Sequence, residues 1–192
     1  PARLIPSDAF GKETALASIF LASLRMVTEF RTAIFNNVGL SHSKDIRFYR
    51  EVAFKDFEGL RVDGLILVIR GGKIIDSAII EVKNGSENIN KSQIENYINI
   101  ADTYRIHKLI TISNQFVSAP TQFPLDMNGL RHKVTLLHMS WSMIKTVAHL
   151  LLIDNESNIA DPDQIAIMEE VVDYWVRKVG NKTAGIDEFT SM

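Results

Sequence analysis

The amino-acid sequence predicts a mixed α/β fold in one domain spanning residues 1–192. Two runs rich in Val, Ile and Leu, at residues 60–69 and 74–82, flank a Gly-Gly pair, which is typical of a β-hairpin. Segments with helical spacing precede and follow this hairpin. Hydrophobic residues make up 46% of the 192 residues, which is enough for a buried core and excludes disorder as the main state. No internal repeat or long linker divides the chain.

Composition excludes several classes of protein. The absence of Cys excludes a disulfide framework, thiolate zinc sites and a cysteine nucleophile, and it fits a reducing, cytoplasmic location. No apolar run is long enough for a membrane span, and residues 1–13 lack a signal core. The net charge is −2, with a slight basic excess in residues 1–110 and an acidic one in residues 111–192. Because the chain begins with Pro1, we expect a processed protein or a domain excised from a longer one.

The first half of the chain predicts a helix, three strands and a second helix. Residues 12–37 contain no Gly or Pro and predict one long amphipathic helix, capped by Ser7 or Asp8 and ended near Gly39. Alternation predicts a strand over residues 46–54, before the two hairpin strands. Residues 89–105 have apolar and aromatic side chains at helical spacing and predict the second helix. The apolar stripe of the first helix is expected to comprise Ile19, Ala22, Met26 and Phe30.

The second half predicts two more strands and two more helices. Residues 108–113 form a short apolar strand, and a loop punctuated by Pro120 and Pro124 follows. A strand is expected over residues 134–139, a helix over 141–152 and a last helix over 162–178, with Pro162 in its first turn. Tyr174 and Trp175 of this last helix are expected to pack against the core. The five His residues have no metal-binding spacing.

Three charged residues interrupt the apolar hairpin. Asp63 lies within the first strand, and Glu81 and Lys83 end the second. Charges in such strands are costly unless they are paired, exposed or bound to a metal. Two carboxylates suit Mg²⁺ or Mn²⁺, which would polarise a phosphoryl oxygen and activate water, while a lysine orients or deprotonates that water or neutralises charge. The alternatives without a functional role are a turn or edge-strand carboxylate paired with Arg61 or Lys83 for Asp63, and a solvated strand end for Glu81 and Lys83.

The register of the hairpin tests this interpretation. With a strict two-residue turn at Gly71-Gly72, Asp63 would face Ile80, and the two carboxylates would lie on opposite faces. A shared metal site therefore requires an irregularity. We predict a bulge at Asp63-Gly64, because Gly within a strand often marks one.

The motif of Asp63 followed by Glu81-Val82-Lys83 resembles that of the PD-(D/E)XK nuclease superfamily. The resemblance covers about residues 12–113 and implies a restriction-endonuclease-like core of a helix, three strands, a helix and a strand, with an added C-terminal strand and helices. It implies that Asp63, Glu81 and the Val82 carbonyl bind the metal and that Lys83 assists the attacking water. An upstream glutamate, Glu51 or Glu29, could complete the site. Val62 departs from the family, which often has Pro there.

Gln93 and Tyr97 resemble the Gln-x-x-x-Tyr motif of RecB-like members, although an ordinary amphipathic helix would have the same spacing. The resemblance implies that they approach the active site and the nucleic-acid backbone. Candidate phosphate contacts are Lys91, Arg105 and Lys73, each also explicable as surface charge.

The sequence thus predicts a Mg²⁺- or Mn²⁺-dependent nuclease that hydrolyses phosphodiester bonds, most simply in DNA, and that could act as a homodimer. The alternative is a catalytically silent module with the same fold that binds nucleic acid or a protein partner. The weak net charge favours the alternative, whereas the intact Asp, Glu and Lys set favours the enzyme.

Overall fold

The central feature of the computed structural model is a mixed five-stranded sheet in the order β1-β2-β3-β4-β5. The structure describes residues 13–85, 87–153 and 161–179. Strands β1 to β3 form an antiparallel meander, and β3, β4 and β5 run parallel to one another. The elements along the chain are α1 (Glu13–Met26), α2 (Thr28–Val38), β1 (Asp45–Ala53), β2 (Arg61–Arg70), β3 (Lys73–Val82), α3 (Lys91–Tyr104), β4 (Lys108–Ser113), β5 (Thr135–Ser140), α4 (Trp141–Ile153) and α5 (Pro162–Lys178).

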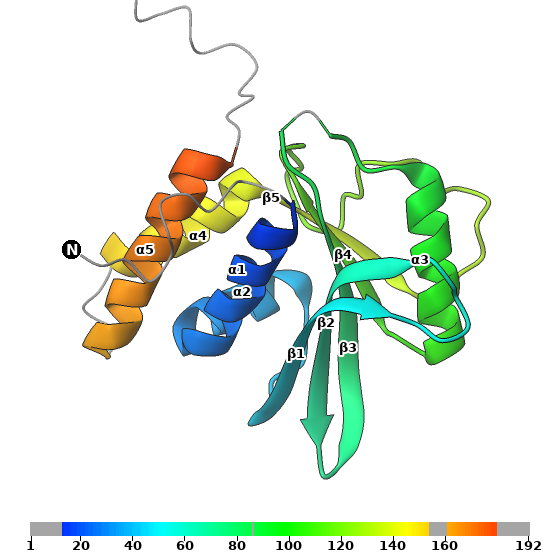
Figure 1. The fold of residues 1–192 in the computed structure, drawn as a ribbon, viewed down its shortest axis with the longest axis horizontal. Coiled ribbons are helices and arrows are strands. Elements are labelled where there is room, and N and C mark those ends of the chain that lie inside the picture. The colour runs from blue at the N-terminus through cyan, green and yellow to red at the C-terminus, as the bar shows by residue number, and fades with distance from the viewer. Residues whose placement is uncertain (1–12, 86, 154–160, 180–192) are drawn as a thin grey trace, which may run out of the picture.

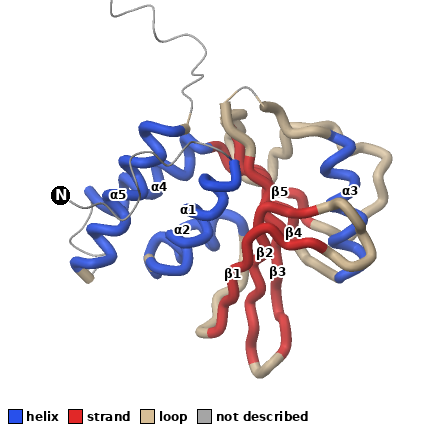
Figure 2. Tube along the Cα trace, viewed as in Figure 1, coloured by secondary structure: helices blue, strands red, loops and turns tan. Residues whose placement is uncertain are grey.

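The two faces of the sheet are covered unequally. Helices α1, α2, α4 and α5 lie on one face, and α3 lies on the other (Figure 1). The side chains of β3 alternate between the two resulting cores: Ile80 packs among the four helices, whereas Ile79 packs under α3. The far end of the β2–β3 hairpin extends beyond the helices (Figure 2). The predicted α/β class is therefore confirmed.

The prediction of one long helix over residues 12–37 is wrong, because the helix is interrupted at Val27 and forms two helices, α1 and α2. This residue has extended backbone angles and is fully buried between α1 and α2. The Arg31 guanidinium donates a hydrogen bond of 3.0 Å to the Leu24 carbonyl, so it satisfies a carbonyl that the end of α1 leaves free. Gly39 ends α2 in the left-handed conformation, as expected. The predicted caps Ser7 and Asp8 lie outside the described residues.

The expected apolar stripe of the first helix is also wrong in part. Leu16, Phe20 and Leu24 form the fully buried face of α1. Met26 is instead 51% exposed. The helical periodicity was detectable, but α1 is apolar on more than one side, so spacing alone did not identify the face that meets the sheet.

The hairpin contains the irregularity that brings Asp63 and Glu81 to one face, at a different position from the one predicted. Gly71 and Gly72 both have positive φ, which a two-residue hairpin turn demands. The register shifts by one residue between Val68 and Ile69, and Gly64 consequently pairs with Ile80. The next residues along the two strands, Asp63 and Glu81, therefore face each other on the same side of the sheet.

The elements after the hairpin confirm the prediction to within about two residues. Asn90 caps α3 by accepting a hydrogen bond from the Ser92 amide, and Asp161 caps α5 in the same way, with Pro162 in the first turn. Tyr174 and Trp175 are fully buried, as expected. The rings of Trp141, Phe20 and Phe30 surround Trp175 at centroid distances of 5.8–6.4 Å.

A buried histidine links β5 to the loop that follows β4. His138 is fully buried; its Nε2 lies 3.0 Å from the Gln115 carbonyl oxygen and its Nδ1 lies 2.8 Å from the Thr111 hydroxyl. A neutral ring satisfies both contacts, by donating to the carbonyl and accepting from the hydroxyl. Burial lowers the pKa of His138 below its ordinary value of 6.5, although the hydrogen bond to Gln115 opposes the shift.

This arrangement predicts a pH-dependent contribution to stability. Below pH 6.5 the unfolded chain takes up a proton that the buried ring resists, so the contribution of His138 falls as the pH falls. His138→Leu should lose about 1–3 kcal/mol at pH 8, because the Gln115 carbonyl loses its donor and the Thr111 hydroxyl keeps only a long 3.4 Å contact with the Leu137 carbonyl. It should also lose this part of the pH dependence. Urea unfolding between pH 5 and 8 measures both effects. If the free energy of unfolding changes equally with pH in the wild type and in His138→Leu, the neutral state assigned to buried His138 is wrong.

Candidate functional site

A pair of carboxylates occupies the end of the β2–β3 hairpin opposite its turn. Asp63 lies in β2, and its Oδ2 accepts a 2.8 Å hydrogen bond from the Val82 amide of β3. Glu81 follows Ile80 in β3 and is only 2% exposed. The hydrogen bond to Val82 places the Asp63 side chain against the backbone just after Glu81. The structure therefore brings together the two carboxylates that the sequence predicted as partners.

Lys83 joins this pair and is held by a second glutamate. Its Nζ lies 2.9 Å from Oε1 of Glu81 and 3.2 Å from Oε2 of Glu13, in the first turn of α1. The other oxygen of Glu13 accepts a 3.2 Å hydrogen bond from the Asn84 amide. Lys83 is 13% exposed, so its ammonium lies between two carboxylates with little access to water. Glu13 is a site residue that the sequence interpretation missed.

Glu81 lies in surroundings that disfavour its charged form. Burial, with the nearby charge of Asp63, raises the pKa of Glu81 to about 7 despite the opposing effect of Lys83. Burial also raises the pKa of Asp63. One oxygen of Glu81, Oε2, is buried and has no hydrogen-bond partner among the described residues. A buried carboxylate oxygen without a partner is costly, and a bound cation would supply the missing interaction.

Lys83 differs from the two acids, because its raised pKa favours the charged form, whereas the raised pKa values of Glu81 and Asp63 favour the neutral form. Burial of its ammonium acts to lower the pKa, but the hydrogen bonds and charges of Glu81 and Glu13 outweigh burial and raise it above its ordinary value. Lys83 therefore stays protonated at neutral pH. It can donate hydrogen bonds and neutralise negative charge, but it is poorly suited to accept a proton from water.

Gln93 and Tyr97 from α3 lie above the same end of the sheet. The Gln93 side-chain amide donates a 2.9 Å hydrogen bond to the Tyr97 hydroxyl, which in turn donates to the Arg61 carbonyl at 3.1 Å. The pKa of Tyr97 is raised by burial and by the charge of Glu81, so the phenol stays neutral. The predicted Gln-x-x-x-Tyr pair is thus adjacent to Glu81, with Tyr97 tied to the strand that bears Asp63.

Two carboxylates are enough for one hard divalent cation. Mg²⁺ is commonly bound through one or two carboxylates and keeps several waters. Within the described ranges no group of three or more His, Cys, Asp or Glu side chains is arranged to hold a metal. The site therefore fits a hydrated Mg²⁺ or Mn²⁺ and does not fit a cage made wholly of side chains. The Val82 carbonyl remains a predicted ligand.

The two glutamates suggested as additional ligands have other neighbours. Glu51 lies in β1 and has a positive φ of 51°. Its neighbours in β1 pair with Gly64 and Val62, the neighbours of Asp63 in β2. Its carboxylate forms an ion pair of 3.3 Å with Arg61. Glu29 lies in the first turn of α2, where its charge acts on Arg31. Among the upstream glutamates that the structure describes, Glu13 is the one that contacts Lys83.

The candidate phosphate contacts lie at different distances from the carboxylate pair. Lys91 is exposed in the first turn of α3, two residues before Gln93. Lys73 lies beside the hairpin turn, eight residues before Glu81, which corresponds to roughly 26 Å of strand. Arg105 follows the far end of α3, roughly 18 Å along the helix from Gln93. Only Lys91 is therefore placed beside the site.

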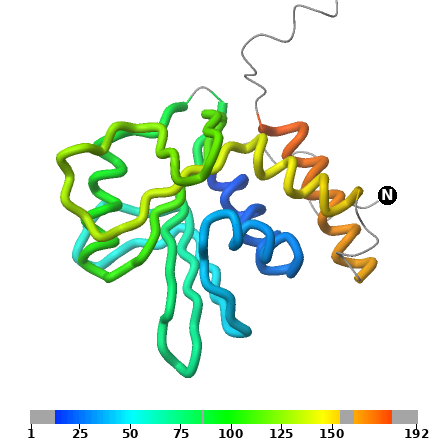
Figure 3. The backbone as a smooth tube through the Cα atoms, turned by 180° about the vertical axis from the view of Figure 1, so that it is seen from behind, coloured from blue at the N-terminus to red at the C-terminus, as the bar shows by residue number. Residues whose placement is uncertain are grey.

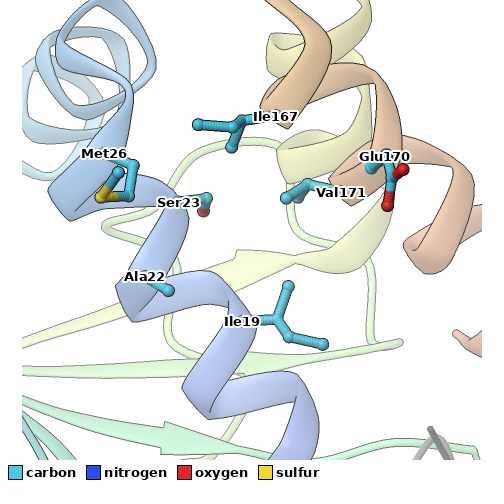
Figure 4. Close-up of a pocket in the computed structure, with 7 residues that line it drawn as sticks. All are labelled: Ile19, Ala22, Ser23, Met26, Ile167, Glu170 and Val171. Atoms are coloured by element: carbon cyan, nitrogen blue, oxygen red, sulfur yellow. The ribbon is translucent and has the colours of Figure 1, made fainter. Parts of the chain in front are cut away.

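A separate hollow lies between α1 and α5, on the other face of the sheet (Figure 4). Ile19, Ala22 and Met26, three residues of the apolar stripe predicted for the first helix, line it from α1. Ile167 and Val171 line it from α5, with Glu170 at the same hollow. Its lining is mainly apolar and brings no pair of carboxylates together, so it does not share the chemistry of the site at Glu81.

Comparison with known proteins gives no family for this chain. A scan against protein-family models finds no match. A search of curated proteins finds no significant relative either. No helix in the described part is long and apolar enough to cross a membrane. The functional assignment therefore rests on the residues of the site.

Proposed function

We propose that this chain is a Mg²⁺- or Mn²⁺-dependent nuclease that hydrolyses phosphodiester bonds in DNA. The observation that carries the proposal is the pair of half-buried Asp63 and buried Glu81 beside the ammonium of Lys83. The unpartnered Oε2 of Glu81 provides a place for a cation. Neighbouring carboxylates whose pKa values are both raised, beside a cationic side chain, are typical of functional sites.

The order of elements supports the same proposal. Helix α1, the meander β1–β2–β3, helix α3 and the parallel strand β4 follow the helix, three strands, helix and strand of the restriction-endonuclease-like core. In that core the motif residues occupy the second and third strands, as Asp63 and Glu81 do here. The additional α2, β5, α4 and α5 would be elaborations of it.

Each residue has a role that its surroundings permit. Asp63 and Glu81 would hold the cation, which supplies polarisation of a phosphoryl oxygen and a bound water of lowered pKa. Lys83, kept protonated by Glu81 and Glu13, would donate a hydrogen bond to the attacking water or to a phosphate oxygen. Gln93 would position the substrate backbone from α3, and Tyr97 would hold Gln93 in place.

Incubation of the full chain with single-stranded and duplex DNA tests the proposal. Cleavage should require Mg²⁺ or Mn²⁺ and should stop when EDTA is added. Asp63→Asn should lower the cleavage rate roughly 100-fold or more, because it removes a charged ligand without changing the shape of the side chain. Asp45→Asn is a matched control, because Asp45 is half exposed near the hairpin turn and pairs only with Arg47 among the described side chains.

Metal-dependent cleavage that survives in Asp63→Asn would contradict the assignment of the site. Absence of cleavage by the wild-type chain, together with metal-independent binding of DNA, would instead favour the silent binding module. Measuring binding in EDTA beside cleavage in Mg²⁺ separates the two results.

A further inference from the structure

An exposed aromatic ring, that of Phe116, lies on the loop that follows β4, the strand next to the one that bears Glu81. Phe116 is 79% exposed, whereas the rings around Trp175 are fully buried. It belongs to the loop between β4 and β5, which runs on the same side of the sheet as α3 (Figure 3). A single exposed apolar side chain is ordinary on a protein surface. The position of Phe116 and the anchoring of its backbone are what distinguish it.

The backbone before Phe116 is fixed to the sheet. The Asn114 side chain donates a 3.0 Å hydrogen bond to the carbonyl of Gly85, two residues after Lys83. The Gln115 amide donates to the Ser113 hydroxyl at 3.0 Å, and the Gln115 carbonyl accepts from buried His138.

The backbone after Phe116 is also ordered. The hydroxyl and amide of Ser118 both donate to the side-chain oxygen of Gln122, at 2.7 and 3.2 Å. The Gln122 amide donates to the Ala119 carbonyl at 2.9 Å, which closes a turn. Phe116 is therefore presented to solvent from a fixed position, so little conformational entropy is lost when its ring meets a ligand.

The register of the parallel strands gives the spacing between Glu81 and His138, the residue that contacts Gln115. Glu81 pairs with Thr111, and Thr111 pairs with His138, so these side chains form a row on the side of α3. Two strand spacings separate Glu81 from His138, or about 10 Å. Gln115 contacts His138, and Phe116 is the next residue. A nucleic-acid strand advances at least about 3.4 Å per nucleotide, so the ring is within reach of a base a few nucleotides from a phosphate held at Glu81.

We propose that Phe116 stacks on an unpaired base and that the substrate is single-stranded, or unpaired near the cleavage point. This inference rests on the proposed nuclease function. An aromatic ring binds any base through its flat face, which requires no particular sequence. Inside a duplex both faces of each base are covered by its neighbours, so an exposed ring gains a partner only where a base is free.

Binding in EDTA tests the stacking separately from hydrolysis. Fluorescent oligo-dT should bind Phe116→Ala about 5- to 100-fold more weakly than the wild-type chain, and Phe116→Tyr should bind within a few-fold of it. Ile153→Ala is the matched control, because Ile153 is also 79% exposed but ends α4. In Phe116→Trp, oligo-dT should quench the new indole, since Trp141 and Trp175, the two Trp residues of the chain, are buried.

Cleavage in Mg²⁺ then tests the substrate class. Phe116→Ala should lower kcat/KM for a single strand by a similar factor and leave cleavage within a blunt duplex nearly unchanged. Wild-type affinity for oligo-dT in Phe116→Ala, or equal losses on single strand and duplex, would overturn the inference. Loss of binding in Phe116→Ala from a wild-type chain that cleaves nothing would support the stacking surface and contradict the nuclease proposal. Normal binding by Phe116→Ala, with cleavage that requires Asp63, would contradict the stacking surface and support the nuclease proposal.

Discussion

Lys83→Met is expected to lower the free energy of unfolding by about 3–5 kcal/mol at pH 8 in the absence of metal. Lys83 supplies the ammonium that contacts both Glu81 and Glu13, at 2.9 and 3.2 Å. Met has nearly the same length but no charge, so the substitution leaves Glu81 buried beside Asp63 without a cation. Removing one partner of a buried ion pair is among the most costly single changes.

The pH dependence distinguishes this charge effect from lost packing. Glu81 already has a pKa of about 7, and losing Lys83 raises it further. Between this higher pKa and about 7 the native variant holds a proton that wild-type Glu81 lacks, so the loss should shrink as the pH falls from 8 to about 7 and stay constant below that. Urea unfolding at pH 8 and pH 5.5 measures the difference, with Lys44→Met, at an exposed lysine, as the control.

A double variant provides the second check. Glu81→Gln with Lys83→Met removes both charges and should recover much of the stability lost in Lys83→Met. If the loss is the same at both pH values and the double variant does not recover, Lys83 stabilises the fold through its methylene groups and not through its charge.

Local signals explain why most of the secondary structure could be predicted. The turn at Gly71-Gly72 requires positive φ at both residues, and flanking β-branched residues define the strands. The charged residues at the strand ends were conspicuous for the same reason, because they interrupt apolar runs. These features are readable within about ten residues of sequence, so they do not depend on the tertiary fold.

The position of the bulge was not readable in this way. Gly64 suggested a bulge at Asp63-Gly64, but the register shifts at Val68/Ile69. Gly64 has a different reason for being small: a Cβ there would lie 2.7 Å from Cδ1 of Leu21 in α1. Its requirement arises from packing between a helix and a strand over 40 residues apart, which no local pattern reports.

Glu13 was missed for a related reason. It precedes Lys83 by 70 residues and carries no motif. An acidic residue in the first turn of a helix is common, because it interacts favourably with the helix dipole. Only the placement of α1 against β3 brings its carboxylate to the lysine. The interruption between α1 and α2 likewise coincides with the burial of Val27, and Val, unlike Gly or Pro, does not by itself end a helix.

Glu81→Gln is expected to abolish metal-dependent cleavage while leaving the metal-free protein at least as stable as the wild type at pH 8. The carboxylate is 2% exposed and its pKa is raised by burial and by Asp63, so its ionised form is disfavoured in the native state. A neutral amide of the same shape removes that cost, and the ammonium of Lys83 keeps the carboxylate of Glu13 as its partner. Activity and stability should therefore change in opposite directions, as is typical of residues retained for chemistry and not for folding.

Metal binding provides the direct measurement for this variant. At a Mg²⁺ concentration 100 times the Kd, the wild-type chain should gain about 2.7 kcal/mol of stability, and Glu81→Gln should gain little. Because the cation must displace a proton from Glu81, wild-type affinity should increase as the pH rises through about 7, and the variant should lack this dependence. Glu169→Gln, at an exposed position of α5, is the control. Full Mg²⁺ stabilisation of Glu81→Gln would show that the cation binds elsewhere, and the unpartnered Oε2 would then need another explanation.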